Sequence, residues 1–363
     1  MRIHVIGTDR NPSTTKVPMD CYAMVSYYLT TYLHRAGHEV HYYGYKESTV
    51  ECNKKWECAN EDDWNNLQGI DSANANFTES PVLHDIFFTN ARDHLVTNCN
   101  DGDIILCMWS SAVRWIKDAI NTKYVNVKIV DAHVGHYWPE KDTSYHVFAS
   151  NANKHFCYGK HDDQDTGYWQ DTVIYPMAND LNNFKYNEDK DDYFLFMGRL
   201  QSDKGIDIFI SLAKHFPNKK FKVAGKGLYT YEELPNVEFL GLVGIEDRKK
   251  YLSNAKAVIS PSHYAEPFGL TAVEASLSGT PIITTDYGGY CETVIDKVTG
   301  FRCSYWNDFV NAINNIETIK PKDCRNHGEQ FSAESLIKDW ERYLHRINRN
   351  GWYDLDEQLP KEL

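Results

Sequence analysis

The chain has 363 residues, 42% of them hydrophobic and 25% charged, which is typical of a globular protein with room for two domains. Its formal net charge of −13 disfavours nucleic acid and anionic membrane surfaces as partners. No apolar run approaches the roughly 18 residues of a membrane span, and the first residues lack the apolar core of a signal peptide, so we expect no transmembrane segment and no export.

Cysteine usage indicates the cellular compartment. The chain has nine cysteines, an odd number, and no two of them form a CxxC pair. This pattern favours reduced thiols over a disulfide framework, because extracellular frameworks use paired cysteines. The sequence therefore predicts a cytoplasmic protein.

The amino-terminal half alternates strands with helices. Strands are expected at 2–7, 39–45, 103–109, 125–132, 145–150 and 172–176. Helices are expected at 19–36, 82–98, 111–120 and 152–160. The polar stretch 46–80 is left without an element. Such alternation favours a parallel sheet with both faces covered by helices.

The alternation restarts after a polar, charged interval at 181–193, which we interpret as a linker. Strands are expected at 193–198, 220–225, 237–240, 257–261 and 281–285. Helices are expected at 205–216, 246–255, 269–278, 306–316 and 333–348. The sequence therefore predicts an α/β protein with two doubly wound Rossmann-like domains, 1–185 and 186–332, followed by a helix and tail at 333–363.

The most informative segment is Glu266-Pro-Phe-Gly-Leu-Thr-Ala-Val-Glu274. Glu266 follows a predicted strand, and Glu274 lies inside the helix that begins near Gly269. A helix N-terminus offers free N–H groups and a partial positive charge, which suit a phosphate. The two carboxylates suit sugar hydroxyls, because an ionised carboxylate only accepts hydrogen bonds. The segment therefore predicts a site for a molecule with sugar at both ends and phosphate between them, which is the shape of a nucleotide-sugar.

Two further loops follow predicted strands of the second domain. The segment 198–205 (GRLQSDKG) places Arg199 and Lys204 beside a helix N-terminus, where they suit a departing diphosphate. The segment 286–292 (DYGGYCE) has paired glycines, which let a backbone approach a ligand closely. Taken alone, the first loop is equally typical of a solvated turn, and the second is simply a loop at the end of a strand. All three motifs fall at the carboxyl ends of predicted parallel strands, where open sheets bind ligands.

In this order the three motifs resemble the carboxy-terminal domain of family 4 of the retaining glycosyltransferases, which have the GT-B fold. The resemblance covers residues 194–302 and is weaker over 1–170, where it rests on architecture. It implies two domains facing a cleft, with the C-terminal helix crossing back to the N-terminal domain. It also implies transfer of a hexose from a nucleotide-sugar such as a UDP- or GDP-sugar to a hydroxyl acceptor (a glycan, lipid or small molecule). The anomeric configuration would be retained, and no metal or other cofactor would be needed.

Carried over by position, the donor-binding roles of that family fall on the motifs above. Arg199 and Lys204 would bind the diphosphate, Glu266 the donor sugar and Glu274 the ribose. The other donor-binding residues implied are Gly198, Lys226, Gly227, Phe268, Gly269, Leu270 and Thr271. Catalysis would rest on His133, Arg199, Lys204 and Glu266, mainly through positioning and charge stabilisation.

The amino-terminal domain is expected to supply the acceptor site. A histidine at the end of strand 125–132 resembles the active-site histidine of the family; we prefer His133 for this role, with His136 as the alternative. Histidine can orient a hydroxyl or donate a hydrogen bond to a sugar. The first loop departs from the Gly-Gly pair that many members carry there. Its polar residues Arg10, Ser13 and Thr14 are therefore the candidate acceptor contacts.

Other functions compete with this interpretation. A nucleotide-sugar-binding subunit without turnover would keep the same donor residues. A nucleotide-sugar epimerase of the GT-B fold is disfavoured by the two glutamates with Arg199 and Lys204, and a dehydrogenase is disfavoured by the missing GxGxxG. The acidic pairs at 101–103 and 189–191 have the spacing of metal-dependent transferases. Both precede a strand, so we interpret them as solvated loops.

Overall fold

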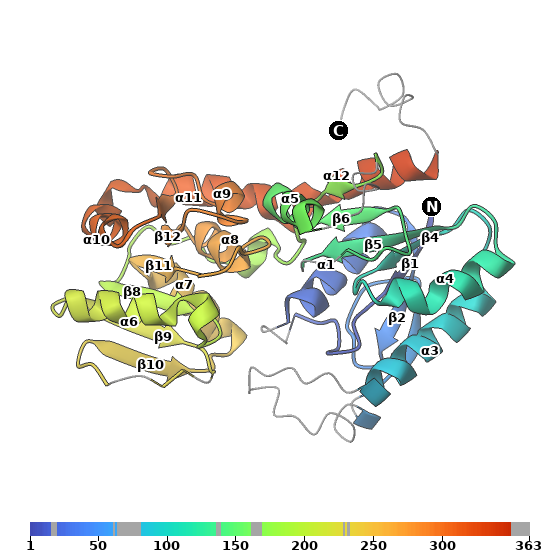
Figure 1. Ribbon diagram of the computed structural model, residues 1–363, viewed down its shortest axis with the longest axis horizontal. Coiled ribbons are helices and arrows are strands. Elements are labelled where there is room, and N and C mark those ends of the chain that lie inside the picture. The colour runs from blue at the N-terminus through green and yellow to red at the C-terminus, as the bar shows by residue number, and fades with distance from the viewer. Residues whose placement is uncertain are drawn as a thin grey trace.

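The computed structural model describes residues 1–15, 20–60, 62–63, 81–135, 139–160, 169–227, 229–230 and 233–349. These residues form two lobes side by side, each built on its own parallel sheet (Figure 1). The strand orders are β3-β2-β1-β4-β5-β6-β7 and β10-β9-β8-β11-β12-β13. The predicted pair of doubly wound α/β domains is confirmed.

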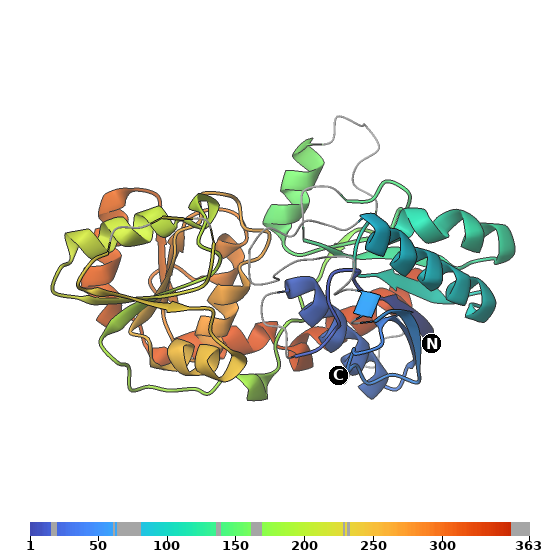
Figure 2. The same cartoon turned by 90° about the horizontal axis from the view of Figure 1, so that it is seen from below.

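The first sheet is covered on both faces, with α3 and α4 on one side and α1 on the other (Figure 2). Its strands are β1 (Arg2–Ile6), β2 (Glu39–Tyr45), β3 (Lys54–Ala59), β4 (Ile104–Cys107), β5 (Lys128–Val134), β6 (His146–Phe148) and β7 (Thr172–Val173). Its helices are α1 (Cys21–Arg35), α3 (Pro81–Asn98), α4 (Ala112–Lys123) and α5 (Asn151–Lys160). Strand β3 falls in the stretch left without an element. It is the edge strand, and its exposed lysines and glutamate hide the apolar pattern that marks inner strands.

The second sheet is built from strands of four or five residues each. Its strands are β8 (Tyr193–Met197), β9 (Lys220–Ala224), β10 (Val237–Gly241), β11 (Ala257–Ser260), β12 (Ile282–Thr285) and β13 (Gly300–Cys303). Its helices are α6 (Ile206–His215), α7 (Ile245–Asn254), α8 (Leu270–Leu277), α9 (Tyr290–Thr293), α10 (Trp306–Asn315) and α11 (Pro321–Gly328), and the 3-10 turns of the chain are η1 (Leu181–Asn183), η2 (Ser202–Lys204), η3 (Ile316–Thr318) and η4 (Glu329–Phe331). The four-residue elements α9 and β13 are too short to show a period in the sequence.

Helix α12 (Ala333–Asn348) follows the second domain in sequence but lies along the first (Figures 1 and 2). Its apolar residues Leu336, Trp340, Leu344 and Ile347 belong to the core cluster of β1, β4 and α1. Tyr32 on α1 donates a hydrogen bond of 2.6 Å to a Glu334 carboxylate oxygen. The chain therefore connects the two domains twice, once through the segment before β8 and once through the start of α12.

The segment before β8 is anchored rather than free. The Lys190 ammonium donates to the carbonyl of Ser253 at 2.8 Å and to the Thr280 hydroxyl at 2.8 Å. Burial lowers the pKa of Lys190 to about 8. Asp189 and Asp191 are exposed, as expected of a solvated loop, whereas the lysine between them is tied to the second domain.

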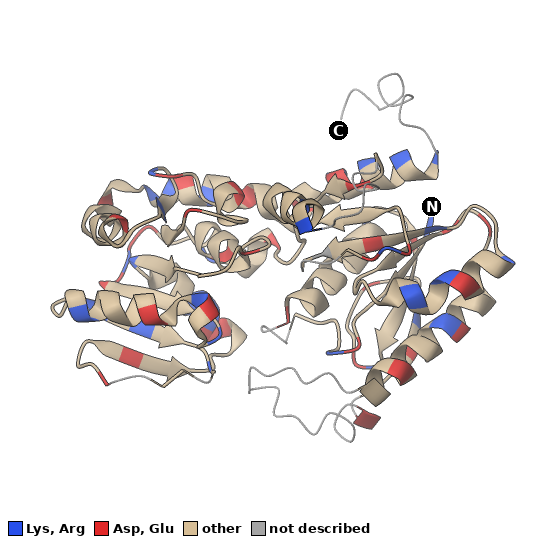
Figure 3. Cartoon of the chain, viewed as in Figure 1, with Lys and Arg blue, Asp and Glu red and all other residues tan. Residues whose placement is uncertain are grey.

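Acidic and basic residues are interspersed over both lobes (Figure 3). Within the described ranges, no helix is long and apolar enough to cross a bilayer. The most buried pairs of ionisable side chains lie within the domains, among them His146 with Asp171 in the first and Arg248 with Glu274 in the second.

Candidate functional site

A cavity of about 370 Å³ opens between the domains, where the carboxyl ends of both sheets face each other. It brings together most of the residues singled out from the sequence. These are Arg10, His133, Gly198, Arg199, Lys204, Glu266, Phe268, Gly269, Leu270, Thr271 and Glu274. Residues more than 250 positions apart thus line one cavity, because the parallel strands of both sheets end at it.

Four predicted site residues are placed elsewhere. Ser13 is buried and accepts a hydrogen bond of 2.8 Å from the Tyr42 hydroxyl, and Thr14 accepts one of 3.1 Å from Thr49. Their side chains hold the first loop against the sheet. Lys226 is exposed, and its carbonyl accepts from the Leu200 N–H at 2.9 Å. Gly227 lies against Leu200, whose carbonyl oxygen would be 2.3 Å from an added Cβ. His136 lies outside the described residues.

The first charged pair of the cavity is Lys204 with Glu266. The Lys204 ammonium lies 2.7 Å from Glu266 Oε1 and 2.5 Å from the Tyr264 hydroxyl. Tyr264 donates to Glu266 Oε2 at 2.7 Å, and Ser262 donates to Oε1 at 2.8 Å. Burial alone would raise the pKa of Glu266, but the lysine charge and these hydrogen bonds hold that pKa below its ordinary value. The site therefore contains a fixed, ionised carboxylate.

Tyr264 was not singled out from the sequence, although it contacts both members of this pair. A tyrosine in a strand-end loop has no motif of its own. Arg199, in contrast, was expected here. It lines the same cavity, is about one-third exposed, and pairs with Asp203 at 3.3 Å.

The second charged pair is Glu274 with Arg248. Glu274 is 1% exposed and bonds the Arg248 guanidinium, which reaches it from α7. A solvent-facing role for Glu274 is therefore excluded. Both side chains line the cavity described above and also border a second cavity of about 560 Å³. No sequence motif pointed to Arg248.

Glycines shape the backbone between Glu266 and Glu274, the acidic members of the two charged pairs. Gly269 has φ of +93° and begins α8, and an added Cβ there would lie 2.6 Å from the Tyr290 ring. The Gly289 N–H donates to the Glu266 carbonyl at 2.7 Å. Gly288 has φ of +66°, and a Cβ there would lie 2.8 Å from the Glu266 nitrogen. Gly288 and Gly289 thus let the loop 286–292 approach the loop that contains Glu266. The sequence had indicated an approach to a ligand instead.

The opposite wall of the cavity is aromatic. His133 is buried, with its ring edge-on to Tyr22 at 4.9 Å between ring centroids. Tyr22 in turn meets Trp109 edge-on at 4.8 Å, and the Arg10 guanidinium lies over the Trp109 ring at 4.2 Å. Tyr22 and Trp109 were not singled out from the sequence. On this side Arg10, Asp20, Tyr22 and His133 line the cavity, so charged groups stand beside flat rings, a surface that suits a sugar.

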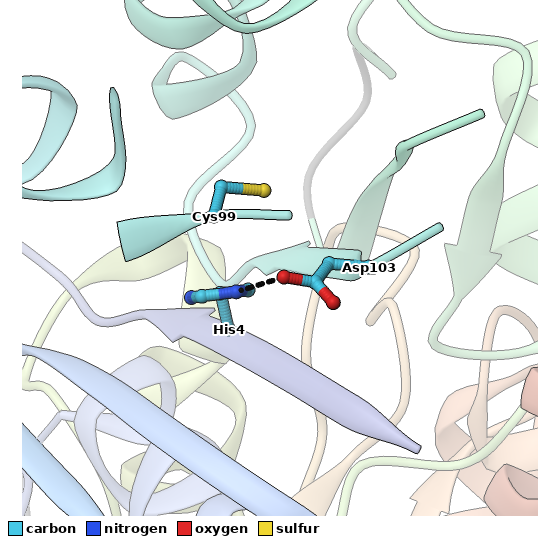
Figure 4. A group of neighbouring side chains, drawn as sticks. All are labelled: His4, Cys99 and Asp103. Carbon is cyan, nitrogen blue, oxygen red and sulfur yellow. Dashed lines mark hydrogen bonds and ion pairs between the residues drawn. The ribbon is translucent and has the colours of Figure 1, made fainter. Parts of the chain in front are cut away.

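A separate cluster in the first domain contains metal-ligand residue types: His4, Cys99 and Asp103 (Figure 4). Asp103 is buried, so its interpretation as part of a solvated loop is wrong. Its Oδ2 accepts from Arg2 at 2.9 Å, from His4 at 2.9 Å and from the Asn100 N–H at 2.7 Å. Against the opposing effect of burial, these donors hold the pKa of Asp103 below its ordinary value. Because this oxygen is already engaged and a guanidinium lies beside it, we interpret the cluster as a structural hydrogen-bond network.

Comparison with known sequences concerns mainly the second domain. Residues 179–331 match the family described as Glycosyl transferases group 1. A glycogen synthase of Mycobacterium tuberculosis (strain ATCC 25618 / H37Rv) is 34% identical over 123 residues, 30% of each chain. A D-inositol 3-phosphate glycosyltransferase of Mycolicibacterium smegmatis is 32% identical over 174 residues, 41% of this chain and 40% of that one. The chain thus spans well under half the length of these curated relatives.

Comparison with solved structures covers nearly the whole chain. AviGT4, a glycosyltransferase involved in avilamycin A biosynthesis, has a TM-score of 0.67 at 18% identity, over 96% of this chain and 98% of that one. HepE of Anabaena, solved in complex with UDP-glucose, has a TM-score of 0.65 at 17% identity, over 95% and 99%. These neighbours confirm the predicted GT-B arrangement of two Rossmann-like domains.

Proposed function

We propose that the protein is a glycosyltransferase. It would move a hexose from a nucleotide diphosphate sugar to a hydroxyl acceptor, with retention of anomeric configuration and without a metal. The observation that carries the proposal is the cavity itself. It holds two buried carboxylates, Glu266 and Glu274, on either side of the start of α8, with Arg199 and Lys204 beside them. The match of residues 179–331 to Glycosyl transferases group 1 supports the same activity.

In this proposal each charged group has one role. The ammonium of Lys204 and the guanidinium of Arg199 stabilise the negative charge that grows on the departing diphosphate. Glu266 accepts hydrogen bonds from hydroxyls of the transferred sugar, and Glu274 accepts them from the ribose. Because Glu266 already bonds Lys204, sugar and phosphate recognition share one network.

The reaction requires one bond to form and one to break at the anomeric carbon. The acceptor oxygen bonds that carbon on the face from which the diphosphate oxygen leaves, and an oxygen of the departing phosphate takes the acceptor proton. Neither glutamate acts as a nucleophile, so catalysis rests on alignment and charge stabilisation. The loop 266–269 is called the donor loop below. His133, on the opposite wall of the cavity, orients the acceptor hydroxyl or a sugar hydroxyl.

A ligand screen tests the donor part of the proposal. The melting temperature of the protein is measured with UDP-, GDP- and ADP-sugars in the presence of a chelator, together with release of free sugar. A donor at about 100 times its Kd should stabilise the fold by about 2.7 kcal/mol. Stabilisation by one nucleotide class with slow sugar release supports a transferase. Stabilisation without turnover under any acceptor would identify a binding subunit, and no response to any donor would contradict the proposal.

His133→Ala should impair transfer more than donor binding. Loss of a hydrogen bond to a charged or reacting group corresponds to about 10–100-fold in transfer rate. Donor affinity, measured by calorimetric titration, should stay nearly unchanged because Lys204, Glu266 and Glu274 are intact. His155→Ala, on the exposed face of α5, is the matched control and should behave as wild type. Unimpaired transfer in the His133 variant would remove this histidine from the site.

A further inference from the structure

Glu292 on α9 of the second domain reaches across to the first domain. Its Oε2 accepts from the Asn151 backbone N–H at 3.0 Å and from the Asn151 side-chain amide at 3.0 Å. Its Oε1 accepts from the Ala152 N–H at 2.8 Å. Both N–H groups belong to the first turn of α5, where a helix has no internal acceptors for them. A carboxylate also complements the partial positive charge of a helix N-terminus. One domain thus caps a helix of the other.

The same contact region touches the donor loop. The Tyr175 hydroxyl donates to Glu292 Oε2 at 3.1 Å, and the Tyr175 ring stacks on Phe268 at 5.4 Å with an interplanar angle of 28°. The Ser150 hydroxyl donates to the Pro267 carbonyl at 2.5 Å. Ser150 of the first domain and Tyr175 of the segment between β7 and β8 therefore contact the donor loop directly.

Helix α9 and the residue before it are also joined to the donor loop by hydrogen bonds. The Gly289 N–H donates to the Glu266 carbonyl at 2.7 Å, and the Thr293 hydroxyl donates to the Phe268 carbonyl at 3.4 Å. The close approach of Gly288 to Glu266 leaves no room for a side chain between them. Movement of Glu292 relative to the loop is therefore restricted, and whatever holds Glu292 also holds the loop.

We propose that Glu292 is a positioning residue. It fixes the position of the donor loop relative to the first domain, which would supply the acceptor site. This inference rests on the proposed transfer reaction. Among its hydrogen-bond partners described above, none is a donor-binding residue, so its removal should leave donor binding intact. It should misalign the acceptor hydroxyl with the anomeric carbon, because about 1 Å of misplacement can cost 10²-fold in rate. Water then competes better with the acceptor for the donor sugar.

The test compares Glu292→Ala with Glu238→Ala. Glu238 is an exposed glutamate on β10 that pairs with Lys222, so the control makes the same change of charge away from the interface. Donor affinity, transfer rate and donor hydrolysis rate are measured for both variants. In Glu292→Ala the ratio of transfer to hydrolysis should fall by about tenfold or more, with donor Kd nearly unchanged. The control should match the wild type.

Two further measurements separate positioning from a folding defect. Hydrogen exchange of the amides of Asn151 and Ala152 should accelerate in Glu292→Ala while the β8–β12 core stays protected. Tyr175→Phe keeps the stacked ring but removes one donor to the carboxylate, and should lower the same ratio by a smaller factor. An unchanged ratio despite faster exchange, or equal losses of donor affinity and transfer, would overturn the inference. If the wild type itself shows no turnover with any donor, the proposed function fails instead.

Discussion

Lys204→Ala should lower kcat for transfer by about 10²–10³-fold, because it removes the fixed positive charge that, in the proposed reaction, faces the departing diphosphate. It also removes the ammonium beside buried Glu266, to which the hydroxyls of Tyr264 and Ser262 still donate. Steady-state kinetics with a saturating donor measures the effect. Lys222→Ala is the matched control, because that lysine pairs with exposed Glu238 on the sheet face. Near-normal kcat in Lys204→Ala would contradict the assignment of the diphosphate site.

The same variant has an expected pH signature. The folded-state pKa of Glu266 lies below its ordinary value of 4.5. Glu266 therefore contributes stability that is present above that value and is lost as the pH falls through the lower folded pKa. The difference in unfolding free energy between the wild type and Lys204→Ala should be large at neutral pH and smaller below about pH 4.5. Denaturant unfolding at both pH values checks this, and a pH-independent difference would show that the pair with Glu266 is not its source.

Glu274→Leu should destabilise the fold by about 3–5 kcal/mol, because it leaves the Arg248 guanidinium without its buried carboxylate. If Glu274 accepts hydrogen bonds from the ribose as proposed, donor binding should weaken by about 10–100-fold. Denaturant unfolding measures the first effect and calorimetric titration with the free nucleoside diphosphate measures the second.

A double variant separates these two effects. Replacing a buried ion pair by apolar residues of similar size is often neutral or stabilising. Glu274→Leu combined with Arg248→Met should therefore recover most of the lost stability while donor binding stays weak. Recovery of donor affinity together with stability would mean that Glu274 acts on the fold alone. Arg248→Met by itself should resemble the single Glu274 variant in stability, because it leaves the buried carboxylate unpaired.

The residues predictable from the sequence are those whose placement is local. Glu266, Gly269 and Glu274 lie in one strand-loop-helix unit, so their spacing alone sets them around the start of α8. Arg248 reaches Glu274 from a neighbouring helix, and a single arginine among the charged residues of α7 gives no local sign of its partner. The sheet order, which sequence does not state, brings these helices together.

The same reason accounts for the errors. Asp103 lies in an acidic turn that precedes a strand, a position typical of a solvated loop, yet Arg2 and His4 reach it from about a hundred residues away. Tyr22 fits a helix or core pattern equally well, so its place on the cavity wall, with its ring against Trp109, follows only from the assembled first domain. Long-range pairing, rather than local propensity, decided each of these positions.

Helix α12 has a consequence for the order in which the protein is made. The first domain leaves the ribosome long before residues 333–348 are synthesised, yet Leu336, Trp340 and Ile347 complete its hydrophobic core. The apolar face of α1 therefore stays uncovered by α12 until the whole second domain has been translated. The core of the first domain is therefore completed only after the second domain has been translated.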